Sequence, residues 1–186
     1  MKILGLDSSG IVASVAIVED ENLIAEYTVN YKKTHSQTLL PMLDELVKMT
    51  ELDLDTIDAI AVAAGPGSFT GLRIGSATAK GLGLALKKPL VEIPTVDALA
   101  YNLYDSRALI CPIMDARRSQ VYTGIYRFQE HKLVTVEAQM AVPMAEMIEK
   151  LNARGEEVVF LGDGVPVFGK MIQENLKVPY SFAPAM

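Results

Sequence analysis

The sequence predicts an α/β protein of two lobes, each built on a mixed β-sheet with covering helices. Three strand-like runs, 2–6, 11–18 and 22–29, follow one another directly and predict an antiparallel meander. A meander excludes a plain doubly wound parallel sheet, so a mixed sheet with covering helices remains. The second observation is a repeated order of strand, aspartate, tight turn and strand, which occurs at Asp7 and again at Asp115. This repetition indicates an internal structural repeat, although any two hairpins share some likeness.

The first lobe continues with alternating helices and short apolar strands. The patterns predict, in order, helix 34–49, strand 57–64, helix 70–86, strand 90–93 and helix 95–103. The first of these helices begins with a capping box, in which Thr34 is the N-cap and Gln37 reaches back. Pro41 predicts a kink in the same helix. We therefore assign residues 1–105 to the first lobe and 106–186 to a second, smaller lobe.

The second lobe opens on another hairpin. An apolar strand over 109–114 stops at Asp115, and a five-residue turn, 116–120, leads into strand 121–128. A third strand is predicted over 132–137, which makes a second meander.

Composition limits the possible classes of protein. The chain has 186 residues, half of them hydrophobic, with a net charge of −6. No apolar run has the roughly 20 residues that a membrane span needs, and the first residues do not resemble a signal peptide, so we expect a cytoplasmic protein with no membrane partner. Basic residues cluster only as the pairs at 32–33, 87–88 and 117–118. Nucleic-acid binding needs a broader basic face, so we expect another subunit to hold any nucleic acid. Cys111, the single cysteine, is expected to be a core thiol.

The stretch AGPGSFTGLRIG, residues 64–75, poses the question of a phosphate-binding loop. It lacks the lysine of a P-loop, and Thr70 stands where a dinucleotide-binding loop needs its third glycine. The loop does follow a strand and open a helix, so anion binding remains a lesser alternative. We favour a structural role, in which Gly65 and Gly67 shape the turn and Ser68 or Thr70 caps the helix.

Small residues continue along that helix at a spacing of four. Gly71, Gly75, Ala79 and Gly83 form one ridge, and glycine inside a helix costs about 0.5–1 kcal/mol relative to alanine, which predicts close approach of another backbone. Helix 34–49 has a wide apolar arc, so we expect both helices to form an interface with another subunit. The alternative is that both are sandwiched inside the fold. The expected interface comprises His35, Leu39, Met42, Leu43, Leu46, Gly71, Gly75, Thr78, Ala79 and Leu82. Gly75→Leu is then predicted to abolish association and leave the fold intact.

No catalytic or metal-binding group is expected from the residues. His35 and His131 each lack a neighbouring ligand at helical spacing. A carboxylate followed by two hydroxyls, Asp7, Ser8 and Ser9, could hold a metal-bound phosphate. The second turn has no glycine and two arginines, so half of a phosphate clamp is missing. We expect any nucleotide binding at these three residues to be vestigial, with the two aspartates capping their turns and no cofactor bound.

The two hairpins resemble those of the actin and sugar-kinase superfamily, which implies an actin-like, ribonuclease H-like (ASKHA) fold. Five motifs are more specific: LGLDSS, THSQTLLPMLDEL, AVAAGPGSFTGLRIG, KGL and MDARRSQVYTGIY are very similar, in order and spacing, to the bacterial TsaB family, also called YeaZ. Members of that family run longer and finish with a further helix, so the resemblance implies a second lobe that is truncated at its C-terminus and incompletely covered.

The resemblance also implies a function and partners. TsaB proteins are non-catalytic relatives and partners of TsaD, and they work with the ATPase TsaE. The complex installs threonylcarbamoyl on N6 of the adenosine beside the anticodon, in tRNAs that read codons beginning with A. In the family, the helices that match 35–49 and 70–86 form the dimer surface, both with TsaD and in homodimers, while tRNA is contacted only indirectly. Two other classes stay open on the residues alone, an ATP-dependent enzyme of the actin-like superfamily and a degenerate glycoprotease-like peptidase.

Overall fold

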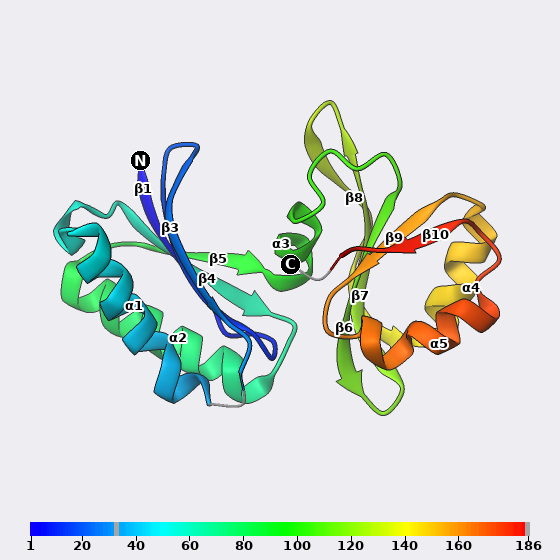
Figure 1. Ribbon diagram of the computed structural model, residues 1–186, viewed down its shortest axis with the longest axis horizontal. Coiled ribbons are helices and arrows are strands. Elements are labelled where there is room, and N and C mark those ends of the chain that lie inside the picture. The colour runs from blue at the N-terminus through cyan, green and yellow to red at the C-terminus, as the bar shows by residue number, and fades with distance from the viewer. Residues whose placement is uncertain (32–33, 185–186) are drawn as a thin grey trace. The chain divides into compact units, whose positions relative to one another are not determined.

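The computed structural model describes residues 1–31 and 34–184. The chain divides into two compact units, Met1–Thr95 and Val96–Met186. Each unit contains one five-stranded sheet with helices packed on it (Figure 1).

The sheet of the first unit combines an antiparallel meander with two parallel strands. Its strands are β1 (Lys2–Asp7), β2 (Ala13–Glu19), β3 (Asn22–Val29), β4 (Ala59–Gly65) and β5 (Leu90–Pro94). Their order across the sheet is β3-β2-β1-β4-β5, with β1 pairing antiparallel to β2 and parallel to β4. The mixed sheet expected from the meander is thus confirmed.

Two long helices, α1 (His35–Thr50) and α2 (Phe69–Leu86), pack on one face of this sheet. A short 3-10 helix, η1 (Leu54–Thr56), precedes β4 and was not foreseen. Thr34 is the N-cap of α1 as predicted, but its side chain makes no capping bond. Its hydroxyl lies instead 3.1 Å from that of Ser36, so the predicted capping box is wrong.

The second unit repeats the same plan. It contains α3 (Thr95–Tyr101, whose first residue closes the first unit), β6 (Leu109–Arg117), β7 (Gln120–Gln129), β8 (Lys132–Pro143), α4 (Met144–Arg154), β9 (Val158–Leu161), α5 (Val165–Asn175) and β10 (Tyr180–Phe182). The strand order is β8-β7-β6-β9-β10, again three antiparallel strands followed by two parallel ones. The internal repeat indicated by the two hairpins is therefore present.

Helices cover both faces of the second sheet. On one face α4 and α5 enclose a core that includes Phe160. On the other, Val96 and Ala100 of α3 pack with Ile110 and Tyr126. The division between the units falls after Thr95, the first residue of α3, whereas the sequence predicts it after residue 105. The expectation that the second lobe is incompletely covered is corrected as well.

No helix in the described part of the chain is long and apolar enough to cross a membrane.

Candidate interaction site

The glycine loop joins β4 to α2 and is shaped by its two glycines. Gly65, at φ +100°, adopts a backbone conformation that L side chains rarely reach, and the Gly65–Pro66 peptide is cis. A Cβ at Gly67 would overlap the carbonyl oxygen of Ser9. Ser68 is the N-cap of α2, and its Oγ accepts a hydrogen bond from the N–H of Gly71 at 3.2 Å. Of the two predicted caps, Ser68 and not Thr70 does the capping.

The same loop lies directly on the turn between β1 and β2. The N–H of Ser68 donates to the Ser9 carbonyl at 2.6 Å, and the Ser8 hydroxyl donates to the Gly71 carbonyl at 2.9 Å. From α1, Nε2 of His35 lies 2.8 Å from the Gly10 carbonyl, which requires a proton on that nitrogen. The turn is thus tied both to the glycine loop and to the start of α1.

This packing bears on the interpretation of the first turn as a vestigial nucleotide site. Ser8 and Ser9 are each only 2% exposed, and the hydroxyl of Ser8 is bonded to the Gly71 carbonyl. Asp7 accepts a hydrogen bond from the N–H of Ser9 at 2.7 Å, which is the turn-capping role expected as the alternative.

The second turn has the same cap and a different backbone. Oδ1 of Asp115 accepts from the N–H of Arg117 at 2.9 Å, so both aspartates bond to the residue two places on. Three successive residues, Arg117, Arg118 and Ser119, have φ of 68°, 52° and 60°. Because β6 continues to Arg117, the turn is shorter than the five residues predicted.

The glycine ridge of α2 faces the protein's own sheet, which corrects the predicted interface. Gly71, Gly75, Ala79 and Gly83 are the buried residues of the helix. A Cβ at Gly71 would overlap the Ser8 carbonyl oxygen, and one at Gly75 would lie 2.7 Å from the Ser8 Oγ. The close backbone approach that the ridge predicted is real, but at Gly71 the backbone is that of Ser8, in the turn after β1, and at Gly83 it is that of Lys88. Contrary to the prediction, we therefore expect Gly75→Leu to disturb the fold.

The apolar arc of α1 is buried in the same way. Leu39, Met42, Leu43 and Leu46 are at most 5% exposed and pack in the core between helix and sheet. These four residues do not lie on an open surface either. Of the rest of the predicted interface, His35, Thr78 and Leu82 are partly buried, and Leu82 packs against the same core.

Other large apolar side chains of the two helices are exposed to solvent. Leu40 and Met49 on α1 and Phe69 and Leu84 on α2 are between 52% and 83% exposed, and the helices contact each other. We call these four residues the outer α1–α2 face. Leu40 and Met49 are separated by about two and a half helical turns, so they lie on opposite flanks of α1. Exposed large apolar side chains are candidates for contact with another protein. The predicted interface did not include these four residues.

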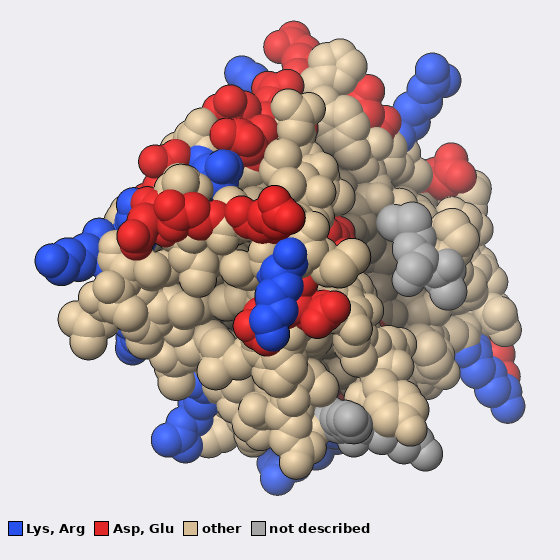
Figure 2. Space-filling view, turned by 60° about the vertical axis from the view of Figure 1, so that its left-hand side comes forward, with Lys and Arg blue, Asp and Glu red and all other residues tan. Residues whose placement is uncertain are grey.

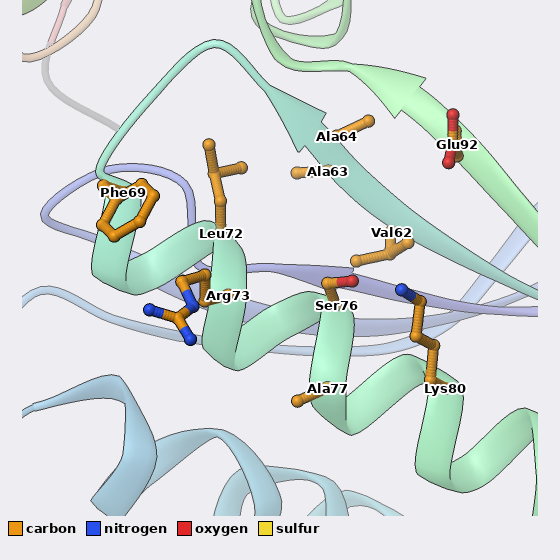
Figure 3. A pocket seen from close by; sticks show the side chains of 10 residues that line it. All are labelled: Val62, Ala63, Ala64, Phe69, Leu72, Arg73, Ser76, Ala77, Lys80 and Glu92. Atoms are coloured by element: carbon orange, nitrogen blue, oxygen red, sulfur yellow. The ribbon is translucent and has the colours of Figure 1, made fainter.

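An open pocket of about 570 Å³ lies beside α2. Figure 3 shows α2 along one side of it and β4 and β5 along the other. Its lining comprises Val62, Ala63, Ala64, Phe69, Leu72, Arg73, Ser76, Ala77, Lys80 and Glu92. The Arg73 guanidinium lies 5.3 Å from the centroid of the Phe69 ring, which holds that exposed ring in a cation–π contact. Because Phe69 belongs to both, the pocket extends the outer α1–α2 face toward the edge of the sheet.

The charge on the visible surface does not favour the binding of a polyanion. In Figure 2 the basic side chains stand singly, whereas many acidic ones gather together. The pair Lys32-Lys33 lies outside the described residues. Within residues 1–31 and 34–184, no three His, Cys, Asp or Glu side chains are placed to hold a metal ion.

Two copies of a β-β-β-α-β-α-β unit, each opening on an aspartate-capped hairpin, place the protein in the actin-like fold class. The fold of the PilM–PilN pilus biogenesis complex is similar at a TM-score of 0.54 and 11% identity, with 98% of this chain and 88% of that one covered. At that identity the likeness concerns the fold alone.

The chain belongs to the TsaB family, within the wider group matched by the TsaD family model, tRNA N6-adenosine threonylcarbamoyltransferase, over residues 22–185. The tRNA threonylcarbamoyladenosine biosynthesis protein TsaB of Bacillus subtilis is 36% identical over 176 residues, which are 95% of this chain and 77% of that protein. Its namesake in Escherichia coli is 30% identical over 88% of this chain and 72% of its own. The solved structure of YeaZ from Pseudomonas aeruginosa matches with a TM-score of 0.83 at 26% identity, covering all of this chain and 84% of that one.

Proposed function

We propose that this chain is a non-catalytic subunit of the cytoplasmic machinery that forms N6-threonylcarbamoyladenosine in tRNA. Membership of the TsaB family supports the pathway. The structural observation that supports the non-catalytic role is the burial of Ser8 and Ser9 under the glycine loop. A nucleotide-using actin-like enzyme needs that turn open to phosphate.

In this proposal the chain acts by binding TsaD, and TsaE joins the resulting complex. The outer α1–α2 face, with Leu40, Met49, Phe69 and Leu84, is the docking surface, in place of the buried ridge. Each of these side chains contributes about 2 kcal/mol if a partner buries it fully. In the absence of TsaD, the same face joins two copies of this chain. tRNA is then contacted through TsaD.

Leu84→Arg tests the docking surface. We expect at least a tenfold loss of affinity for TsaD from the same organism, since about 1.4 kcal/mol corresponds to that factor. Isothermal calorimetry gives the affinity, and mass spectrometry of digested tRNA gives the yield of modified adenosine in the reaction with TsaD and TsaE. Val167→Arg is the matched control, because Val167 is an exposed apolar residue of α5 in the other unit. Equal affinities for Leu84→Arg and Val167→Arg would rule out the outer α1–α2 face as the docking surface.

A second experiment separates the scaffold from an ATP-using enzyme. Calorimetric titration of the chain alone with ATP and magnesium is expected to show no binding with Kd below about 10 µM. Tight binding, lost in Ser8→Ala, would instead assign the first turn to a nucleotide and overturn the non-catalytic role.

A further inference from the structure

The pocket beside α2 has charges of opposite sign on its two walls. Lys80 belongs to α2, and Glu92 belongs to β5 on the other side of the pocket. Figure 3 shows the Lys80 side chain rising from the helix toward the strands, while the Glu92 carboxylate stands on β5. All lining residues lie between positions 62 and 92, so the pocket belongs to the first unit alone.

Neither of these two charges is bonded to an opposite charge. In the part of the chain that the structure describes, no ion pair includes Lys80 or Glu92, so their charged atoms are too far apart to bond directly. Both residues are exposed at the pocket. A small molecule with a negative and a positive group fits between the two walls and bonds to both of them.

The helix wall of the pocket is suited to a carboxylate. Ser76 and Lys80 are four residues apart on α2, so their side chains are neighbours on one side of the helix. In Figure 3 the Ser76 hydroxyl and the Lys80 amine point into the same part of the pocket. A hydroxyl and an ammonium group both donate hydrogen bonds, and the two oxygens of a carboxylate accept them.

The rest of the lining is suited to an ammonium group and an apolar side chain. The Glu92 carboxylate accepts hydrogen bonds from an ammonium group. Toward the start of α2 the lining is apolar, with Ala64, Leu72 and the Phe69 ring that Arg73 holds. Apolar surface that a ligand covers there adds to its affinity. The volume of about 570 Å³ lies within the range of small-molecule sites.

We propose that this pocket binds a free α-amino acid with an apolar side chain. The carboxylate of the amino acid bonds to Ser76 and Lys80, its ammonium group bonds to Glu92, and its side chain lies toward Leu72. An α-amino acid carries both charged groups on one carbon atom, whereas a peptide has only one of them at each end.

Other ligands match the two walls less well. A simple anion leaves Glu92 unpaired, and a nucleotide brings its phosphates close to the Glu92 carboxylate, which repels them. The site is separate from the proposed docking of TsaD, since neither Lys80 nor Glu92 belongs to the outer α1–α2 face.

Titrations of the 186-residue chain with L-leucine test the proposal. We expect a Kd of about 1 mM or lower and shifts of the methyl NMR signals of Val62, Ala64 and Leu72. Leucinamide lacks the carboxylate, N-acetylleucine lacks the ammonium group and glycine lacks the side chain, so each should bind at least about fivefold more weakly. Unchanged methyl signals with L-leucine, or equal affinities for L-leucine and N-acetylleucine, would overturn the proposal.

Two substitutions of exposed residues assign each charge of the ligand to its wall. Glu92→Gln should weaken the binding of L-leucine about fivefold and leave that of N-acetylleucine unchanged, because N-acetylleucine has no ammonium group. Lys80→Gln should in the same way weaken L-leucine and leave leucinamide unchanged. Lys170→Gln and Glu174→Gln are the matched controls, since they neutralise an exposed charge pair on α5 of the second unit. The proposal is wrong if Glu92→Gln and Lys80→Gln bind L-leucine as tightly as these controls.

Discussion

The two units share one strand order but differ in how far the turn after the first strand is buried. In the first unit the glycine loop covers Ser8 and Ser9, at the start of the β1–β2 turn, and the Ser8 hydroxyl bonds to the Gly71 carbonyl. In the second unit the β6–β7 turn is exposed, and three successive L-residues from Arg117 have positive φ. Duplication thus preserved the backbone plan, while side-chain size decided which turn is sealed and which is open.

The pattern of small and large residues explains the difference. Glycines at 67, 71 and 75 allow α2 and its loop to reach the first turn. In the second unit, Gly162 and Gly164 pack on the Ile113 carbonyl, which lies within β6 and well before its last residue, Arg117. A helix can seal a turn only where its own side chains leave room for a backbone contact.

The largest expected effect lies at the sealed turn. Gly71→Ala places a Cβ against the Ser8 carbonyl oxygen, and we expect a loss of about 3 kcal/mol in the free energy of unfolding. Urea denaturation measures the loss. The matched control is Gly81→Ala in the same helix, where nothing lies within 4 Å of the added methyl. That variant should gain about 0.5–1 kcal/mol, and a loss of similar size in both variants would show that backbone contact does not distinguish the two positions.

The second prediction uses the buried thiol of the second unit. Burial raises the pKa of Cys111 from its ordinary value near 9 to about 12. The pKa of Cys111 is higher in the folded protein than in the unfolded chain. The contribution of this thiol to stability is therefore complete below pH 9 and is lost as pH rises toward 12. Above pH 9 the free energy of unfolding then falls with a slope that approaches about 1.4 kcal/mol per pH unit.

Cys111→Ala isolates this contribution. Free energies of unfolding measured between pH 9 and pH 10 should fall less steeply in the variant than in the original chain. The window stops at pH 10 because burial and the hydrogen bond to Asp97 also raise the pKa of Tyr126. The contribution of Tyr126 to stability begins to be lost near that pH. Parallel slopes in the two proteins would mean that Cys111 does not titrate with folding.

The smallest effect is expected at the open turn. Arg118→Gly removes the backbone strain of an L-residue at φ 52°, but it also makes the unfolded chain more flexible. We expect a net gain of about 0.5 kcal/mol in the free energy of unfolding. Arg118→Ala removes the same charge and keeps the strained backbone, so it should give no gain. Thermal unfolding of the two variants side by side measures the difference, and equal Tm values would assign any gain to charge.

Much of the fold could be predicted because the signals are local. The meander, α1, α2 and both aspartate-capped turns follow from apolar periodicity and turn residues within a few positions. Beyond residue 137 we assigned no element, and α4, β9, α5 and β10 emerged only in the structure. The capping box at Thr34 failed because a side chain that can cap can also bond to a neighbouring hydroxyl.

The sequence by itself determined that α2 carries a ridge of small residues and that some backbone must approach it closely. It determined the family as well, through the order and spacing of its motifs. Only the tertiary structure decided that the approaching backbone is the Ser8–Ser9 turn of the same unit, and that Leu40 and Leu84 remain on the surface. The physical reason is that a helical period groups residues onto one face but contains no information about what covers that face.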